Sequence, residues 1–101
     1  MTKGNQGPAA RIILYTKAEC ELCHAAEATL LMLQRELDFE IDKVDITTDP
    51  TLYDAFRMEI PVAYLDGRKL FKYHVNPSLL RRQLHRRSGW LVGRWFASVR
   101  S

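Results

Sequence analysis

The sequence predicts one α/β domain in which a mixed four-stranded sheet is flanked by helices. Two apolar runs, residues 11–16 and 39–47, enclose a stretch of helical periodicity, an arrangement typical of parallel strands joined by a crossover helix. A third run, residues 61–65, precedes Asp66-Gly67, a dipeptide that favours a tight hairpin and therefore an antiparallel pair. The predicted order of elements is β-α-β-α-β-β-α.

The first strand, the first helix and the second strand follow from the spacing of apolar residues. "RIILYT" (11–16) is short, apolar and partly β-branched, as expected of a buried strand. From Cys20 onward an apolar stripe recurs every three or four residues and predicts an amphipathic helix. Its members are Leu22, Ala26, Leu30, Leu33 and Leu37. "FEIDKVDIT" (39–47) alternates apolar and polar residues, with a slip near Lys43, and predicts the second strand.

Two pairs of a capping residue and a proline mark the starts of the remaining helices. These pairs are Asp49-Pro50 and Asn76-Pro77. The first predicted helix reaches Phe56, and the second runs to about Arg87, where Gly89 is placed to end it. Between the two helices, "PVAYL" and "RKLFKY" predict the strands of the hairpin.

Length and composition indicate a globular domain. The chain has 101 residues, of which 47% are hydrophobic and 27% charged, and these values exclude a disordered chain. No run approaches the length that crosses a membrane, and "MTKGNQGPAAR" lacks the apolar segment of a secretory signal, so we expect a cytoplasmic protein. We divide the chain into a flexible N-terminus (1–10), a folded domain (11–88) and a basic aromatic tail (89–101).

Charge is distributed unevenly along the chain. The net charge is +3, and no Asp or Glu follows Asp66. The tail carries an apolar stripe at helical spacing, formed by Leu91, Val92, Trp95, Phe96 and Val99. Two interpretations stay open: the stripe packs on the domain, or it docks an acidic protein or an anionic membrane surface. We do not expect nucleic acid as a partner.

The segment "CELCH" (20–24) allows several interpretations. C-x-x-C-H is the attachment signal of a c-type haem. A haem protein also needs an axial ligand, more helix around the porphyrin and export, whereas these cysteines follow a predicted strand. A metal site could join Cys20, Cys23 and His24 to His74 or His85, but a second closely spaced ligand pair is missing. Two inert buried cysteines are the structural alternative.

A thiol–disulfide redox pair explains more of the pattern. Cysteines three residues apart on a first helical turn share a face and lie close enough for a disulfide. The N-terminus of a helix stabilises a thiolate through its unpaired amides and its positive dipole end. We therefore expect Cys20, at the tip, to be the exposed nucleophile and Cys23, one turn inside, to be the resolving thiol.

"YTKAECELCHAAEATL", followed by "DIT" and "IPVAYLDGRKL", resembles the small glutaredoxin-like proteins of the thioredoxin superfamily from about Arg11 to Arg87. The resemblance implies a thioredoxin-like fold in which Pro61, after a cis Ile60–Pro61 peptide, faces the cysteine pair and shields it from adventitious metal. It also implies that the backbone of Ile60 pairs with the substrate. A further implication is that Lys17 lies near the thiolate and the carboxylate of glutathione.

The chain departs from glutaredoxins around this motif. Glu21-Leu22 replaces the common Pro-Tyr, and the charges of Glu19 and Glu21 disfavour a thiolate at Cys20. "FKYHVNPS" (71–78) lacks the Gly-Gly-acid segment with which glutaredoxins hold glutathione. We therefore expect little glutathione binding.

The resemblance and the cysteine pattern together predict a monomeric dithiol–disulfide oxidoreductase in cell redox homeostasis. It would bind no cofactor and would use its own redox-active disulfide, Cys20–Cys23. Its partners would be a disulfide substrate and a thiol reductant, either glutathione or a thioredoxin reductase system. The alternative is a thioredoxin-fold binding module that docks a partner through the basic tail, with cysteines that are only redox-sensitive.

Overall fold

The structure, a computed structural model, describes residues 10–86. The elements are β1 (Ala10–Thr16), α1 (Glu21–Leu33), β2 (Phe39–Asp45), the 3-10 turn η2 (Ile46–Thr48), α2 (Pro50–Phe56), β3 (Val62–Leu65), β4 (Arg68–Lys72) and a helix of residues 77–86. The expected end of the last helix near Gly89 and the basic tail lie outside the described residues, as does nearly all of the expected N-terminal segment.

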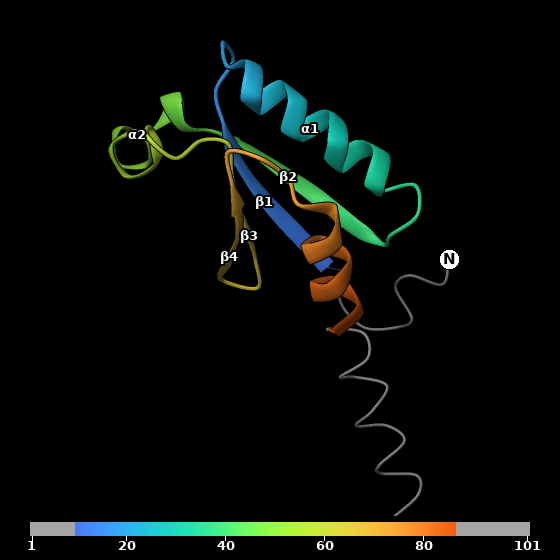
Figure 1. Cartoon of the computed structure of the whole chain (residues 1–101). Helices are drawn as coiled ribbons and strands as arrows, with labels where there is room; N and C mark the ends of the chain where they lie inside the picture. Colours follow the sequence, from blue (N-terminus) through green and yellow to red (C-terminus); the bar gives the residue numbers. More distant parts are fainter. Residues whose placement is uncertain (1–9, 87–101) are drawn as a thin grey trace, which may run out of the picture.

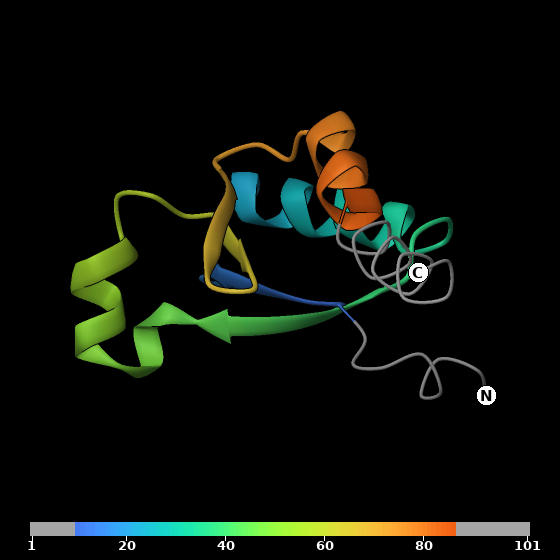
Figure 2. The same ribbon diagram turned by 90° about the horizontal axis from the view of Figure 1, so that it is seen from below.

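The four strands form one mixed sheet in the order β2-β1-β3-β4. β1 and β2 are parallel, in register from Ala10 opposite Phe39 to Thr16 opposite Asp45. β3 runs antiparallel to both β1 and β4. The helix α1 and the helix of residues 77–86 cover one face of the sheet, whereas α2 lies beyond the carboxyl end of β2 (Figures 1 and 2). The predicted fold class is therefore confirmed.

β2 contains no slip at Lys43, contrary to the prediction. Lys43 pairs in unbroken register with Leu14. Its exposed ammonium group reaches α1 and contacts the carboxylate of Glu27 at 3.2 Å. A cation therefore occupies a position where the alternation called for an apolar residue, because the edge of the sheet leaves room for a long side chain to reach water.

The buried face of α1 also differs from the predicted stripe. Leu22 is 42% exposed, whereas Cys23 beside it is 1% exposed and joins the face of Ala26, Leu30 and Leu33. The helix ends at Leu33, so Leu37 packs against the core from the turn that follows. The spacing of apolar residues fitted two neighbouring faces of α1, one that includes Leu22 and one that includes Cys23. The face with Cys23 is the one that packs on the sheet.

The predicted caps and hairpin are present. The side chain of Asp49 accepts a hydrogen bond from the amide of Thr51 at 2.8 Å at the start of α2. Asn76 does the same for the amide of Leu79 at 3.1 Å. Asp66 and Gly67 have φ angles of 54° and 80°, as a type I′ turn requires at both central positions.

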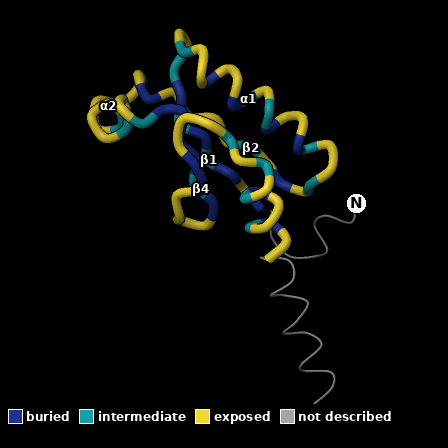
Figure 3. The backbone as a smooth tube through the Cα atoms, viewed as in Figure 1, coloured by how far each residue is buried: buried dark blue, intermediate teal, exposed yellow. Residues whose placement is uncertain are grey.

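The buried residues form two clusters. Figure 3 colours the backbone at the buried positions dark blue. The larger includes the inward side chains of β1, Ile12 and Leu14, with Leu30 of α1 and Leu80 of the last helix. The smaller contains Cys23 and lies at the end of the sheet where β1 leads into α1. Within residues 10–86, no helix is both long enough and apolar enough to cross a membrane.

Candidate redox-active site

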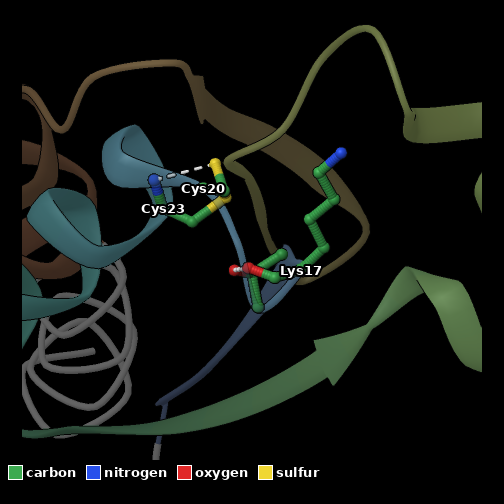
Figure 4. Close-up of a disulfide and its surroundings, with 4 residues drawn as sticks. Lys17, Cys20 and Cys23 are labelled. Carbon is green, nitrogen blue, oxygen red and sulfur yellow. Dashed lines mark hydrogen bonds between the residues drawn. A yellow bond between two sulfur atoms is a disulfide. The ribbon is translucent and has the colours of Figure 1, made fainter.

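The two cysteines form a disulfide at the N-terminus of α1. Cys20 is the N-cap, with extended backbone angles (φ −150°, ψ 107°), and Cys23 lies in the first turn. Their Cα atoms are 5.2 Å apart. The amide of Cys23 donates a hydrogen bond to Sγ of Cys20 at 3.1 Å (Figure 4). The sulfur of Cys20 thus takes the place that a Ser or Asp side chain fills in most helix caps.

The two sulfur-bearing residues differ in their access to solvent. Cys20 is half-buried, whereas Cys23 is 1% exposed. Cys23 packs in one cluster with Ile46, Ile60 and Val62, and Cys20 contacts the rim of this cluster. Cys20 is therefore the more accessible residue of the pair.

An aromatic group supports this cluster from α2 and the sheet. Tyr15 stacks on Phe56 with ring centroids 4.3 Å apart, and both rings meet Tyr64 edge-on at 6.0 Å. Such pairs stabilise a core beyond simple burial. Through them α2 is fixed to the end of the sheet that carries the cysteines.

The segment before β3 contributes Ile60 and Pro61. Their peptide bond is cis, as expected from the resemblance. Pro61 is fully buried, and Ile60 packs in the cluster of Cys23. The amide of Ile60 donates to the carbonyl oxygen of Phe56 at 3.1 Å. Within residues 10–86 the carbonyl oxygen of Ile60 accepts no hydrogen bond, so its amide has a partner in the described residues and its carbonyl has none.

Lys17 lies directly after β1. The β1–β3 register ends with Tyr15 opposite Val62, so Lys17 follows the last paired residue of β1 by two positions, and Ile60 precedes the first paired residue of β3 by two. The side chain of Lys17 points away from the two sulfur atoms (Figure 4). The structure therefore brings Lys17 to the rim of the site without a contact between its ammonium group and the disulfide.

The other candidate ligands are dispersed. His24 is exposed on α1, and His74 and His85 are exposed on separate parts of the chain. Across residues 10–86, no three or more His, Cys, Asp or Glu side chains are grouped so as to hold a metal ion. The feature that the described residues do assemble is the disulfide between Cys20 and Cys23.

An ion pair anchors the segment that leads to Ile60. Glu59 accepts a hydrogen bond from Nζ of Lys69, on β4, at 2.8 Å. This hydrogen bond and the charge of Lys69 lower the pKa of Glu59 below its ordinary value of 4.5. The loop before β3 is thereby tied to the neighbouring strand.

Sequence reasoning missed Tyr73, which follows β4. Tyr73 has a φ of 70°, and its hydroxyl donates to the carbonyl oxygen of Met58 at 2.7 Å. Its amide donates to the carbonyl oxygen of Pro61 at 2.6 Å. A tyrosine at the end of a β-rich run carries no signal of positive φ, because glycine and asparagine are the usual markers.

A mixed sheet of this order, with a C-x-x-C disulfide at the N-terminus of its first helix, defines a thioredoxin-fold protein with a thiol redox site. The sequence model of the glutaredoxin-like domain (DUF836) matches residues 11–85, and the chain belongs to this family.

The chain is also similar to individual proteins. The chain is 31% identical over 81 residues to the uncharacterized protein Rv0508 of Mycobacterium tuberculosis, and equally to the uncharacterized protein Mb0520 of Mycobacterium bovis. Both alignments cover 75% of this chain and 84% of the relative. The solution NMR structure of protein Ne2328 from Nitrosomonas europaea aligns with a TM-score of 0.68 at 22% identity, covering 76% of this chain and 93% of that one. This last likeness concerns the fold alone.

Proposed function

We propose that this protein is a dithiol–disulfide oxidoreductase that reduces disulfides through Cys20 and Cys23. The observation that carries the proposal is the disulfide at the start of α1. Cys20 is its more accessible residue, and Sγ of Cys20 accepts a hydrogen bond from the amide of Cys23. A helix N-terminus favours a thiolate at that position. Membership of the glutaredoxin-like family supports the same chemistry.

The reaction begins from the reduced pair. The thiolate of Cys20 attacks one sulfur of the substrate disulfide, the S–S bond breaks, and one substrate thiolate leaves and takes a proton from water. The thiolate of Cys23 then attacks Sγ of Cys20 in the mixed disulfide. The bond between Sγ of Cys20 and the substrate sulfur breaks, the second substrate thiolate leaves and takes a proton from water, and Cys20–Cys23 is oxidised to the disulfide. A dithiol or two monothiols return the two electrons.

The surrounding residues have supporting roles in this proposal. The carbonyl of Ile60 accepts a hydrogen bond from the backbone of a bound substrate, and Pro61 shields the dithiol from adventitious metal. Lys17 supplies positive charge at the rim for an anionic group. The protein acts as a monomer in the cytoplasm. Its reductant is a thioredoxin reductase system or, with slow turnover because the Gly-Gly-acid segment is missing, glutathione.

Steady-state disulfide reduction tests the proposal. The assay follows the reduction of insulin by dithiothreitol with the wild-type chain, Cys20→Ser and Cys23→Ser, after circular dichroism has shown that all three are folded. We expect the wild type to accelerate the reaction catalytically and Cys20→Ser to be inactive. A wild-type rate equal to the uncatalysed rate would refute the proposal and leave a binding module as the better account.

A further inference from the structure

Tyr73 occupies a strained turn directly after β4. The amide of His74 donates to the carbonyl oxygen of Lys72 at 2.8 Å, which closes a three-residue turn around Tyr73. With a φ of 70°, this is the rarer and strained form of the γ-turn. For a bulky residue such a conformation persists only where the surroundings hold it in place, and it points to a functional constraint.

Two hydrogen bonds hold Tyr73 against the segment that precedes β3. Its amide donates to Pro61 at 2.6 Å, and its hydroxyl donates to the carbonyl oxygen of Met58 at 2.7 Å. Nζ of Lys72 lies 5.3 Å from the centre of the tyrosine ring, within the range of a cation–π contact. Tyr73 is therefore hydrogen-bonded to both ends of the segment from Met58 to Pro61.

This segment is the one that the proposed function places against a substrate. Ile60 lies within it, in the same cluster as Cys23, and its carbonyl oxygen has no partner within residues 10–86. A backbone acceptor contributes to binding only if it is held in the required direction before the substrate arrives. The hydroxyl of Tyr73 supplies a restraint of this kind from outside the segment.

We propose that Tyr73 is a positioning residue, whose hydroxyl holds residues 58–61 so that the carbonyl of Ile60 can accept the backbone of a peptide substrate. This inference rests on the proposed disulfide reduction. The hydroxyl then sets the affinity for disulfides that carry a peptide backbone. It leaves the chemistry of the Cys20 sulfur unchanged.

The test compares Tyr73→Phe with Tyr53→Phe. Tyr53, on α2, is 39% exposed against 38% for Tyr73, and within residues 10–86 its hydroxyl makes no hydrogen bond. The probes are a synthetic peptide with an internal disulfide, and dithiobis(nitrobenzoate), which has no peptide backbone. Dithiothreitol serves as reductant for the peptide, and the reduced protein is mixed directly with the aromatic disulfide.

We expect Tyr73→Phe to raise KM for the peptide by about three- to tenfold, the range that corresponds to one lost hydrogen bond, with kcat nearly unchanged. The rate with dithiobis(nitrobenzoate) and the alkylation rate of Cys20 should stay at the wild-type values. Tyr53→Phe should behave as the wild type in every assay. Tyr73→Gly, which adopts positive φ without strain, should keep the turn and show the same rise in KM.

Other outcomes overturn the inference. An unchanged KM in Tyr73→Phe would show that the hydroxyl does not position the segment, and equal losses with both probes would show a general structural role. A wild-type chain that reduces neither probe would instead refute the proposed function, so the two failures are distinguishable.

Discussion

The amide of Cys23 donates a hydrogen bond to Sγ of Cys20 across 3.1 Å, so the first turn of α1 is organised around the outer sulfur. When the disulfide is reduced, the same amide and the helix dipole favour a thiolate at Cys20 over one at Cys23. The neighbouring carboxylates of Glu19 and Glu21 are both exposed and act against this effect.

Neutralising those carboxylates should make Cys20 more reactive. In the reduced protein we expect Glu19→Gln and Glu21→Gln each to speed alkylation of Cys20 at neutral pH and low salt, by about two- to fivefold. The gain should shrink as salt is added, because the charges are exposed. Glu40→Gln, on β2, is the control. Rates at or below the wild-type rate in both variants would contradict this electrostatic account.

Glutathione should be a poor partner. Its carboxylates meet the charges of Glu19 and Glu21 beside Cys20, and the stretch after β4 presents the side chain of Tyr73 in place of a Gly-Gly-acid segment. We expect little deglutathionylation in a coupled glutathione assay, under conditions in which dithiothreitol supports reduction of insulin. Turnover with glutathione equal to that with dithiothreitol would show that the chain holds glutathione by other groups.

Two adjacent leucines on α1 test the packing of the helix on the sheet. Leu30 is 0% exposed in the main core, whereas Leu31 is 50% exposed. Leu30→Ala should lower the free energy of unfolding by about 2–5 kcal/mol, since it removes buried apolar contacts and leaves a cavity. Leu31→Ala should change it by about 0.5 kcal/mol or less. Urea denaturation measures both, and equal losses would contradict the observed orientation of α1.

Acid should weaken the tie between the segment before β3 and β4. The pKa of Glu59 is lowered by its hydrogen bond to Lys69, so the folded value lies below the ordinary value of 4.5. The contribution of the pair is therefore complete above about pH 4.5 and is lost as the pH falls through the lowered pKa.

Urea denaturation at several pH values measures this contribution. Between about pH 5 and pH 3, the wild type should lose more stability than Glu59→Gln, which has no carboxyl group to titrate. Asp54→Asn removes a carboxylate on α2 that makes no ion pair within residues 10–86, and serves as the control. Parallel pH curves for the wild type and Glu59→Gln would contradict the lowered pKa.

The fold was predictable wherever a local signal decides the backbone. Asp49 and Asn76 accept the amides of their helices, and Asp66-Gly67 forms the expected turn, because each of these residues acts within a few positions of the chain. The end of α1 at Leu33 carries no such signal. Lys43 interrupted the alternation of β2 without breaking the strand, since its partner Glu27 comes from a distant part of the sequence.

Part of the candidate site was also predictable from the sequence, and part was not. Cys20 and Cys23 could be placed together from their spacing, and the cis peptide at Pro61 from the resemblance. Two further contacts depend on the path of the chain before β3 and after β4. These are the hydrogen bond from the amide of Ile60 to Phe56 and the one from the hydroxyl of Tyr73 to Met58. No pattern of residue types predicts these two contacts. The first joins two backbone groups, and the second depends on a positive φ at Tyr73, where the sequence has no glycine.

The most direct test of disulfide reduction through Cys20 is intact-mass spectrometry of Cys23→Ser after mixing the reduced variant with a peptide disulfide. We expect a stable adduct of one peptide, which peptide mapping places on Cys20, and no adduct on Cys23 in Cys20→Ser. An adduct on Cys23 in Cys20→Ser, with none on Cys20 in Cys23→Ser, would contradict the account.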